Sequence, residues 1–315
     1  MLDIHQLNVF VIAAETLNFT QTARQLHMTQ PSVSQHIQYL ERHFDMELFI
    51  RNGRNLELSD AGMALLPLAR EAVTLSIRTD ELMASLKGSI YGHLIVCCST
   101  TPGKYILPNL LARFHRKHPQ VRVTCQVTSQ TDALRSLVEG ESHFALYSVD
   151  YTNYADIEAV SFMCDPIILI APLTHPWAKR GEIEPEELKD GEFIMREASS
   201  GTFSAVRDAL THKNISLNDM RILITLGNAE AIALAVQEGI GVGFVSQMVI
   251  ERLCSGKVAE VRIRGVDIYR EIYIGHNSRR PATNAQNAFW NFITADENKS
   301  EDRQTIAVRQ DAHEA

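Results

Sequence analysis

The sequence lacks any hydrophobic run long enough to cross a membrane. None of its apolar stretches approaches the roughly 18 residues of a transmembrane helix. The chain opens with Met1-Leu2-Asp3 and has no basic segment of the kind that begins a secretory signal peptide. We therefore expect no membrane partner and no export.

Cysteine is scarce, and its spacing argues against two kinds of site. The five cysteines are Cys97, Cys98, Cys125, Cys164 and Cys254, and no Cys-x-x-Cys pair occurs. An odd number without such spacing argues against a disulfide framework and against structural zinc. We expect reduced thiols in a cytoplasmic protein that holds no metal and no cofactor.

Common enzyme signatures are also missing. Neither His-Glu-x-x-His nor Gly-x-Ser-x-Gly occurs, and the twelve histidines are scattered along the chain. Surface and helix-capping roles account for these histidines, so we expect no catalytic residues. The composition, with 45% hydrophobic and 22% charged residues, is that of an ordinary globular protein. At 315 residues the chain exceeds one typical hydrophobic core, which predicts two or three domains.

Two short helices joined by a tight turn are predicted between about residues 18 and 37. Thr20 is the expected N-cap of the first helix, with Ala23 and Leu26 on its buried side. The second helix restarts at Pro31, because a missing N–H group costs nothing in a first helical turn. Its apolar stripe has the spacing i, i+4 and i+7 and consists of Val33, Ile37 and Leu40.

The other side of this second helix carries hydroxyl and amide side chains, which bond to base edges and phosphates. An amphipathic helix precedes the pair, and residues 49–58 predict two short strands around a glycine turn with an arginine on each side, placed to reach a minor groove. The region thus predicts a winged helix-turn-helix domain in residues 1–60. The expected DNA-contacting residues are Thr20, Thr29, Gln30, Pro31, Ser32, Ser34, Gln35, Gln38, Arg51 and Arg54.

The run from Leu7 to Gly62 resembles the DNA-binding domain of LysR-type transcriptional regulators. The matching positions are Phe19-Thr20, Ala23, Leu26, Gln30-Pro31-Ser32-Val33-Ser34, Ile37, Leu40-Glu41, Leu48-Phe49, Arg51 and Ser59-Asp60-Ala61-Gly62. The chain length and the order of the later segments are similar to that family over all but the last twenty or so residues. The resemblance implies an α/β protein with a winged helix-turn-helix, a dimerising linker helix and a two-lobed effector domain like those of periplasmic binding proteins.

The charge of the DNA-binding region is unusual. Residues 1–60 contain four arginines and no lysine, but seven aspartates or glutamates. Phosphate neutralisation normally dominates non-specific DNA affinity. We therefore predict weak non-specific binding with a shallow salt dependence, and specificity from register-dependent polar contacts.

A long helix is predicted over residues 59–88. Ser59 or Asp60 caps it, Gly88 ends it, and one heptad seam runs along it. The seam positions are Ala61, Leu65, Leu68, Ala72, Leu75, Thr79, Leu82 and Leu86. The resemblance implies that this helix pairs two winged helices on a dyad-symmetric operator in double-stranded DNA. Dimerising lobes would add a second interface, which makes a tetramer the expected assembly.

Beyond Gly88, strands alternate with helices over about 200 residues, a pattern that predicts open α/β structure. The resemblance implies two lobes, and we expect the chain to cross between them near Ser161–Asp165 and Gly265–Tyr269. Lobe 1 then comprises residues 91–162 and 268–295, and lobe 2 comprises residues 163–267. The polar, patternless residues 296–315 predict a disordered tail.

Four junctions between strands and helices carry small polar residues. Ligands of open α/β sheets bind at such junctions, where helix N-termini present free N–H groups. Helix capping explains any single junction, but four together favour a ligand site. The expected effector-binding residues are Ser99, Thr100, Thr101, Lys104, Ser129, Gln130, Arg196, Ser199, Ser200, Thr202, Asn228 and Ser246.

Helix dipoles and hydroxyl donors favour a small anion, such as a carboxylate, a phosphate or a sulfur oxyanion. The segment Arg196-Glu197-Ala198-Ser199-Ser200-Gly201-Thr202 is similar to the effector-contacting segment of family members that sense inorganic sulfur anions or phosphorylated metabolites. The resemblance further implies a cytoplasmic regulator that activates its targets and represses its own gene.

Two other functions fit parts of the sequence. A thiol redox sensor would use its cysteines, but Cys97 and Cys98 are adjacent on an expected strand and point to opposite faces. Peroxide-sensing relatives carry a reactive cysteine near the position of Ser199 and Ser200, so core packing is the preferred role here. A solute-binding or enzymatic α/β protein would fit the two lobes alone, but not the winged helix.

Overall fold

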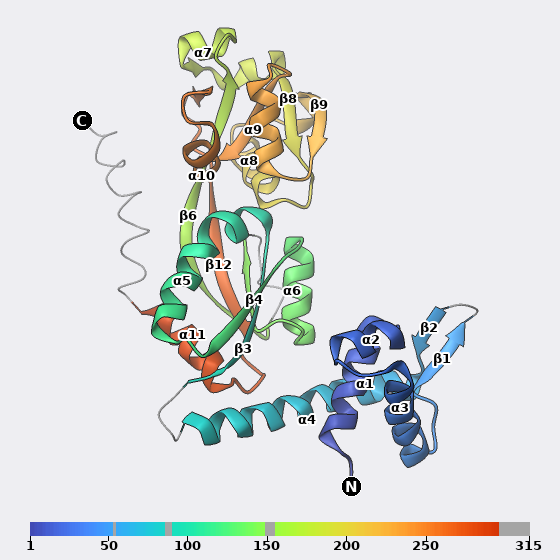
Figure 1. Ribbon diagram of the computed structural model, residues 1–315. Helices are drawn as coiled ribbons and strands as arrows, with labels where there is room; N and C mark the ends of the chain where they lie inside the picture. The colour runs from blue at the N-terminus through green and yellow to red at the C-terminus, as the bar shows by residue number, and fades with distance from the viewer. Residues whose placement is uncertain (53–54, 86–89, 149–154, 296–315) are drawn as a thin grey trace. The chain divides into compact units, whose positions relative to one another are not determined.

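The computed structural model describes residues 1–52, 55–85, 90–148 and 155–295. The chain forms two compact units, Met1–Ser89 and Ile90–Ala315 (Figure 1). Several expectations fall outside the described residues: the position of Arg54, the last seam residue Leu86 with the helix end at Gly88, and the tail 296–315.

The first unit is a three-helix domain with a two-stranded wing and one long helix. Its elements are α1 (Ile4–Thr16), α2 (Phe19–Gln25), α3 (Gln30–Phe44), β1 (Phe49–Asn52), β2 (Asn55–Leu58) and α4 (Asp60–Ser85). β1 and β2 pair as an antiparallel hairpin, with Phe49 opposite Leu58. The core lies between α1, α3 and the wing, and Phe10, Val33 and Leu40 are completely buried in it. The predicted winged helix-turn-helix is thus the observed fold.

Polar caps fix where these helices begin. The N-cap of α2 is Asn18, whose Oδ1 accepts hydrogen bonds from the N–H groups of Thr20 and Gln21 at 3.0 and 3.1 Å. The prediction that Thr20 is this cap was wrong, because the helix starts two residues earlier, at Phe19, and the Asn18 amide oxygen accepts from its first turn. Thr29 caps α3 through the N–H of Ser32, at 3.3 Å.

The heptad seam of α4 divides into two parts. Its early members Ala61, Leu65 and Ala72 pack against the core of the first unit. Other members stay exposed, with exposed fractions of 63% at Leu68, 60% at Leu75 and 54% at Leu82. The prediction of one uninterrupted seam was therefore wrong, since the winged domain already buries part of it. The exposed leucines repeat every seven residues and form a narrower apolar stripe, which we call the α4 stripe.

The second unit is built around one mixed sheet. Its strand order is β4-β3-β5-β12-β6-β10-β8-β9, and β11 pairs with β6 and with β7. The strands are β3 (Gly92–Cys98), β4 (Val121–Val127), β5 (Phe144–Tyr147), β6 (Ile157–Pro172), β7 (Glu182–Ile183), β8 (Glu192–Arg196), β9 (Arg221–Leu226), β10 (Val242–Ser246), β11 (Val258–Ile263) and β12 (Tyr269–Asn277). β3 to β5 form lobe 1 with one end of β6, and β7 to β11 form lobe 2 with its other end.

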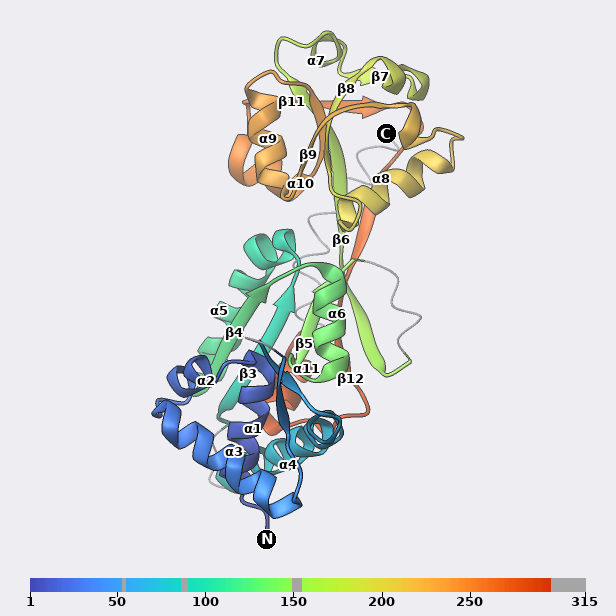
Figure 2. The same ribbon diagram turned by 90° about the vertical axis from the view of Figure 1, so that its right-hand side faces the viewer.

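β6 runs through both lobes, and β12 lies beside its lobe 1 half as far as the junction (Figure 1, Figure 2). They pair antiparallel from Tyr269 opposite Pro166 to Asn277 opposite Ile157. We expected Ser161–Asp165 to be a segment where the chain crosses between the lobes. That segment is strand as well, because the two crossings hydrogen-bond to each other, a long-range pairing that the local residues do not reveal.

Helices cover both faces of each lobe. In lobe 1, α5 (Leu107–Lys117) and α11 (Asn284–Thr294) lie on one face, and α6 (Gln130–Glu139) lies on the other. In lobe 2, α8 (Gly201–Thr211) lies opposite α9 (Ala229–Gln237) and α10 (Gln247–Val249) (Figure 2). A π-helical turn, Pro102–Ile106, precedes α5. Three 3-10 or π-helical turns and the short helix α7 complete lobe 2: Pro185–Asp190, Leu217–Asp219, Ile250–Cys254 and Pro176–Arg180.

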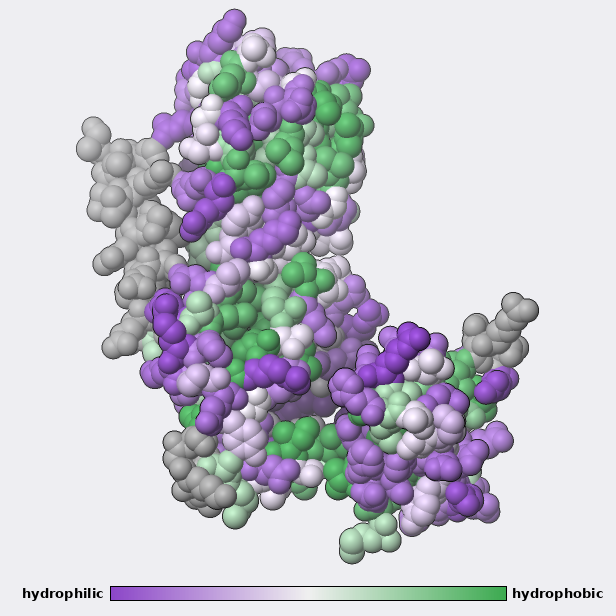
Figure 3. Space-filling view, viewed as in Figure 1, coloured by the Kyte–Doolittle hydropathy of each residue, from purple (hydrophilic) through white to green (hydrophobic). Residues whose placement is uncertain are grey.

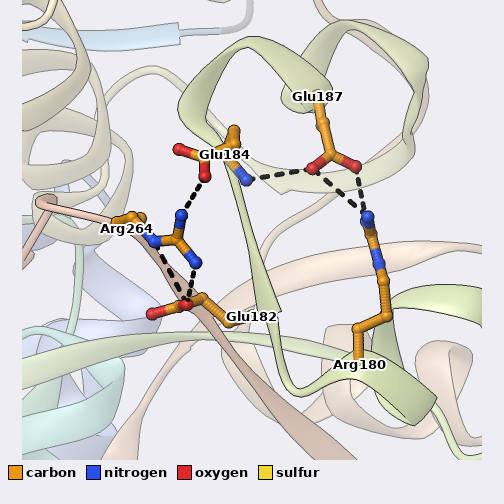
Figure 4. Close-up of polar contacts among 5 residues, drawn as sticks. All are labelled: Arg180, Glu182, Glu184, Glu187 and Arg264. Atoms are coloured by element: carbon orange, nitrogen blue, oxygen red, sulfur yellow. Dashed lines mark hydrogen bonds and ion pairs between the residues drawn. The ribbon is translucent and has the colours of Figure 1, made fainter.

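A cluster of charged side chains ties β7 to its neighbours in lobe 2. Arg264 bonds to Glu182 and Glu184, and Arg180 bonds to Glu187 (Figure 4). Each of these carboxylates has an arginine partner, so we assign the cluster a structural role in lobe 2. Among the described residues, there is no group of three or more side chains that could hold a metal ion, and no helix long and apolar enough to span a membrane.

Candidate DNA-binding and effector sites

The outer side of α3 presents the polar residues that the sequence singled out. Gln35 and Gln38 are exposed, while Ser32 and Ser34 are half-buried. The buried stripe Val33, Ile37 and Leu40 fixes this orientation, because each of these side chains is at most 2% exposed. Gln30 donates from Nε2 to Ser34 Oγ at 2.9 Å, which holds both side chains on the same side of the helix. Thr20 is exposed on α2.

The wing is attached to α3 by a carboxylate. Glu41 Oε1 accepts hydrogen bonds from the N–H groups of Leu48 and Phe49, at 2.9 and 3.4 Å. One acidic residue of this net-acidic region is therefore bound to backbone donors at the base of the hairpin. Arg51 is exposed on β1. Gly62 is also structural, since a Cβ atom there would lie 2.2 Å from the Leu48 carbonyl oxygen.

A buried ion pair lies where the two crossing strands meet. Arg270 on β12 and Asp165 on β6 are direct cross-strand partners. Arg270 Nε donates to Asp165 Oδ2 at 2.7 Å, and Nη2 lies 2.6 Å from the same oxygen. The Asp165 side chain is fully buried and that of Arg270 is 5% exposed. The sequence analysis missed both residues as site residues, because only the antiparallel pairing of β6 and β12 brings them together.

Two predicted effector residues of lobe 2 bond directly to this pair. Arg270 Nη1 donates to Thr202 Oγ1 at 3.2 Å, and Ser246 Oγ donates to Asp165 Oδ1 at 2.6 Å. Thr202 lies in the first turn of α8, and Ser246 ends β10. The pair therefore connects the N-terminus of α8 and the end of β10 to the crossing strands. We call the region around these residues the interlobe junction.

A second group of contacts joins the lobes beside the first. Gln130, at the start of α6, accepts at Oε1 from the N–H and hydroxyl groups of Ser148, at 2.6 and 2.9 Å. Its Nε2 donates across the junction to the Ser199 carbonyl oxygen at 3.4 Å. A Cβ atom at Gly201 would lie 2.0 Å from Ser148 Oγ. Glycine at the start of α8 thus permits the close approach of the lobes.

A third contact uses the helix ahead of α5. Lys104 Nζ lies 3.0 Å from Glu230 Oε1, which joins the π-helical turn of lobe 1 to the first turn of α9 in lobe 2. Neighbouring Tyr105 packs against the apolar cluster under α9. Burial, the Glu230 charge and a hydrogen bond to Glu230 raise the pKa of Tyr105 to about 12. The Tyr105 phenol therefore stays protonated well above neutral pH.

Several predicted effector residues have local bonding partners. Ser129, Ser200 and Asn228 cap α6, α8 and α9, accepting from backbone N–H groups at 3.1, 3.0 and 2.7 Å. Arg196, at the end of β8, is held by Glu197 through two hydrogen bonds of 2.9 and 2.7 Å. Burial alone would raise the pKa of Glu197, but the hydrogen bonds and charge of Arg196 bring it below its usual value.

The first junction of lobe 1 lies at the end of β3. Thr101 is buried, while Ser99 and Thr100 are half-buried. The Ser99 carbonyl oxygen accepts the Gly103 N–H at 3.0 Å, which starts the π-helical turn. Contacts between the lobes thus involve Gln130, Lys104 and Thr202, and Ser246 bonds to Asp165 within lobe 2. The other predicted positions lie nearby as helix caps and strand ends.

The charges at the junction are balanced. Lys104 faces Glu230, Arg196 faces Glu197, and Arg270 faces Asp165. Each of these three side-chain cations therefore has a carboxylate partner.

Comparison with known proteins assigns both units. The model of the bacterial regulatory helix-turn-helix protein, lysR family, matches residues 4–63, and that of the LysR substrate binding domain matches residues 87–297. An uncharacterised helix-turn-helix-type transcriptional regulator of Methanocaldococcus jannaschii is 30% identical over 292 residues, which cover 92% of this chain and 98% of the relative.

Solved structures agree with this assignment. A full-length OxyR variant from Pseudomonas aeruginosa superposes with a TM-score of 0.70 at 20% identity, over 93% of this chain and 95% of that one. The CcmR regulatory domain of Synechocystis PCC6803 in complex with 2-PG gives a TM-score of 0.59 at 26% identity, over 67% of this chain and 98% of that domain. The matched families consist of transcriptional regulators and not of enzymes. This chain belongs to the LysR family of DNA-binding transcriptional regulators, with an N-terminal helix-turn-helix domain and a C-terminal effector-binding domain.

Proposed function

We propose that this regulator responds to a small anion held at the interlobe junction and reads a dyad-symmetric operator through α3 and the wing. The observation that carries the effector half is the set of contacts that joins Gln130, Lys104 and Thr202 to the opposite lobe, with Ser246 bonded to the buried Asp165 beside them. All four positions are among the effector-binding residues expected from the sequence. A similar regulatory domain, that of CcmR, was solved with 2-PG bound.

Coupling follows from the position of these contacts. An anion that binds one lobe arrangement more tightly than another shifts the population toward the first. The difference in binding free energy between the two arrangements can then change the spacing of the two DNA-binding domains or the bending of the operator. We propose activation of target genes and repression of its own gene as the outcome. A protein acting on chromosomal DNA would do so in the cytoplasm.

Two surfaces support self-association. The α4 stripe is exposed in the first unit, and Ile222, Leu223 and Ile224 of the edge strand β9 are between 37% and 42% exposed in the second. Hydrophobic surface is visible over β9 (Figure 3). We propose that a second copy covers the α4 stripe and that another covers β9, which gives a dimer and then a tetramer.

Replacement of Gln35 tests the DNA-reading half. On DNA that the wild-type protein selects from a random library, Gln35→Ala should lower affinity by about tenfold to a hundredfold, because a bidentate amide–base contact contributes about 1–3 kcal/mol. Gln237→Ala is the matched control, since Gln237 is an exposed amide in the second unit. An unchanged footprint and affinity for Gln35→Ala would remove α3 as the reading helix.

A further inference from the structure

Two cysteine sulfur atoms lie close together next to the Pro102–Ile106 turn of lobe 1. Cys98 is the last residue of β3, and Cys125 lies on the neighbouring edge strand β4. Their Sγ atoms are 3.6 Å apart. In the parallel register, Val96 is opposite Cys125 and Cys98 is opposite Val127, so the two cysteines are diagonal neighbours. A disulfide bond measures about 2.05 Å, so the sulfurs need to approach by about 1.5 Å.

Strand alternation places both thiols on the face that α5 covers. Leu94, Val96 and Cys98 belong to the apolar cluster under α5, and Val121 and Val123 of β4 contact the same cluster. Cys125 continues that alternation. Cys97 belongs instead to the cluster under α6, on the opposite face. The structure therefore pairs Cys98 with Cys125 and leaves Cys97 apart, a pairing that the sequence spacing did not predict.

The two thiols differ in exposure and in acidity. Cys125 is exposed, whereas Cys98 is buried. A hydrogen bond from Cys98 lowers the pKa of Cys125 to about 7, against an opposing effect of burial. The same hydrogen bond, together with burial, raises the pKa of Cys98. An accessible thiolate beside a buried thiol is the usual arrangement of an attacking and a resolving cysteine.

Cys98 also supports the turn that carries predicted effector residues. A Cβ atom at Gly103 would lie 2.7 Å from Cys98 Sγ and 3.0 Å from a methyl carbon of Val127. Gly103 belongs to the π-helical turn between Thr101 and Lys104, directly beside the Cys98 sulfur. Any movement of Cys98 Sγ toward Cys125 therefore removes a packing contact from this turn.

We propose that Cys98 and Cys125 form a dithiol site that hydrogen peroxide oxidises to a disulfide. We further propose that the disulfide loosens the Pro102–Ile106 turn, which carries the cross-lobe contact of Lys104. This gives the regulator a redox input in addition to its anion. It uses a different part of the fold from the segment around Ser199 and Ser200.

The oxidation proceeds in two balanced steps. The Cys125 thiolate attacks one peroxide oxygen, the S–O bond forms as the O–O bond breaks, and the departing hydroxide takes a proton to leave as water. The Cys98 thiol then gives up its proton as its sulfur attacks the Cys125 sulfenic acid, the S–S bond forms, and a second water leaves. Two thiols lose two electrons and one peroxide gains them. An added dithiol reverses the reaction by thiol–disulfide exchange.

Peptide mapping of the full-length protein tests the bond itself. After peroxide treatment and thiol blocking, non-reducing trypsin digestion should give residues 88–104 linked to residues 123–135. Cys97 and Cys98 share the first peptide, so Cys97→Ala is the matched control and should keep the link. Cys98→Ala and Cys125→Ser should lose it. A link retained in Cys98→Ala, or one that joins two copies of the chain through Cys125, would overturn the site.

Two further readouts test the thiol chemistry and its consequence. At pH 7, iodoacetamide should alkylate Cys125 about tenfold more slowly in Cys98→Ala than in Cys97→Ala, because the thiolate loses its hydrogen bond. Amide hydrogen exchange in residues 99–107 should become faster on oxidation in the wild type and in Cys97→Ala, but not in Cys125→Ser, whose exposed position tolerates substitution. Equal alkylation rates would contradict the paired thiolate, and unchanged exchange in a fully linked protein would refute the loosened turn.

Discussion

Replacement of Arg270 by methionine should destabilise the effector domain strongly. The change leaves Asp165, whose side chain is fully buried, without its cationic partner. Among the residues that the structure describes, the Ser246 hydroxyl is then its remaining hydrogen-bond donor. Removing one member of a buried ion pair costs about 3–5 kcal/mol, because the remaining charge is not hydrated. Thr202 also loses its bond to Nη1. The stability loss should therefore fall in the upper part of that range.

Urea unfolding at pH 7 measures this loss. For a domain of this size, with a slope of about 2–3 kcal/mol per molar urea, a loss of about 4 kcal/mol lowers the midpoint by about 1–2 M. Fluorescence of Trp177, which is buried in the lobe 2 core, and far-ultraviolet circular dichroism should report the same shift.

A double variant separates the ion pair from simple loss of packing. Asp165→Asn with Arg270→Met removes both charges, so it should be more stable than Arg270→Met alone by about 2 kcal/mol or more. A cost below about 1 kcal/mol for Arg270→Met, or a double variant no more stable than the single one, would refute the account of the junction as a buried, charge-compensated network.

Two further predictions concern assembly and pH. Leu75→Glu places a charge in the α4 stripe, so light scattering should show a tetramer reduced to a dimer, with the dissociation constant of the α4 contact raised by roughly two to three orders of magnitude. Ile77→Glu, which lies off the stripe, should leave the tetramer intact; a tetramer in both variants would contradict an α4 interface. His143 accepts the Ile95 N–H at Nδ1, and burial, aided by the His93 charge, lowers its pKa to about 4. Below pH 6.5 the unfolded chain takes up a proton that the folded chain resists, so stability should fall by up to about 3 kcal/mol as the pH drops from 6.5 to 4. Urea midpoints at pH 7 and 4.5 should show this fall in the wild type and not in His143→Gln; equal falls would assign it to other groups.

Much of the fold could be predicted from the sequence, because local residue patterns determine the helices and strands. The α3 stripe and the polar ends of the strands follow from residue spacing and from capping preferences. The long-range pairings could not be predicted from the sequence. The antiparallel ladder of β6 and β12, the division of the α4 seam and the approach of Cys98 to Cys125 all depend on which segments meet in space.

The effector site was predicted only in outline for the same reason. Thr202 and Ser246 were identified as donors at strand ends, but their partners Arg270 and Asp165 come from the two crossing strands. Such a pair becomes visible only when the crossings are aligned residue by residue. Glu230, which pairs with Lys104, was likewise not among the expected effector-binding residues.

The measurement that tests the central claim most directly is a thermal-shift titration of the full-length protein with small carboxylates, phosphate esters and sulfur oxyanions. At a ligand concentration a hundredfold above its dissociation constant, binding adds about 2.7 kcal/mol to the folded state. We predict that at least one anion of this panel raises the unfolding temperature of the wild type and of Gln237→Ala, and that Thr202→Val abolishes the shift. No shift with any anion, or an equal shift in Thr202→Val, would contradict an anion site at the interlobe junction.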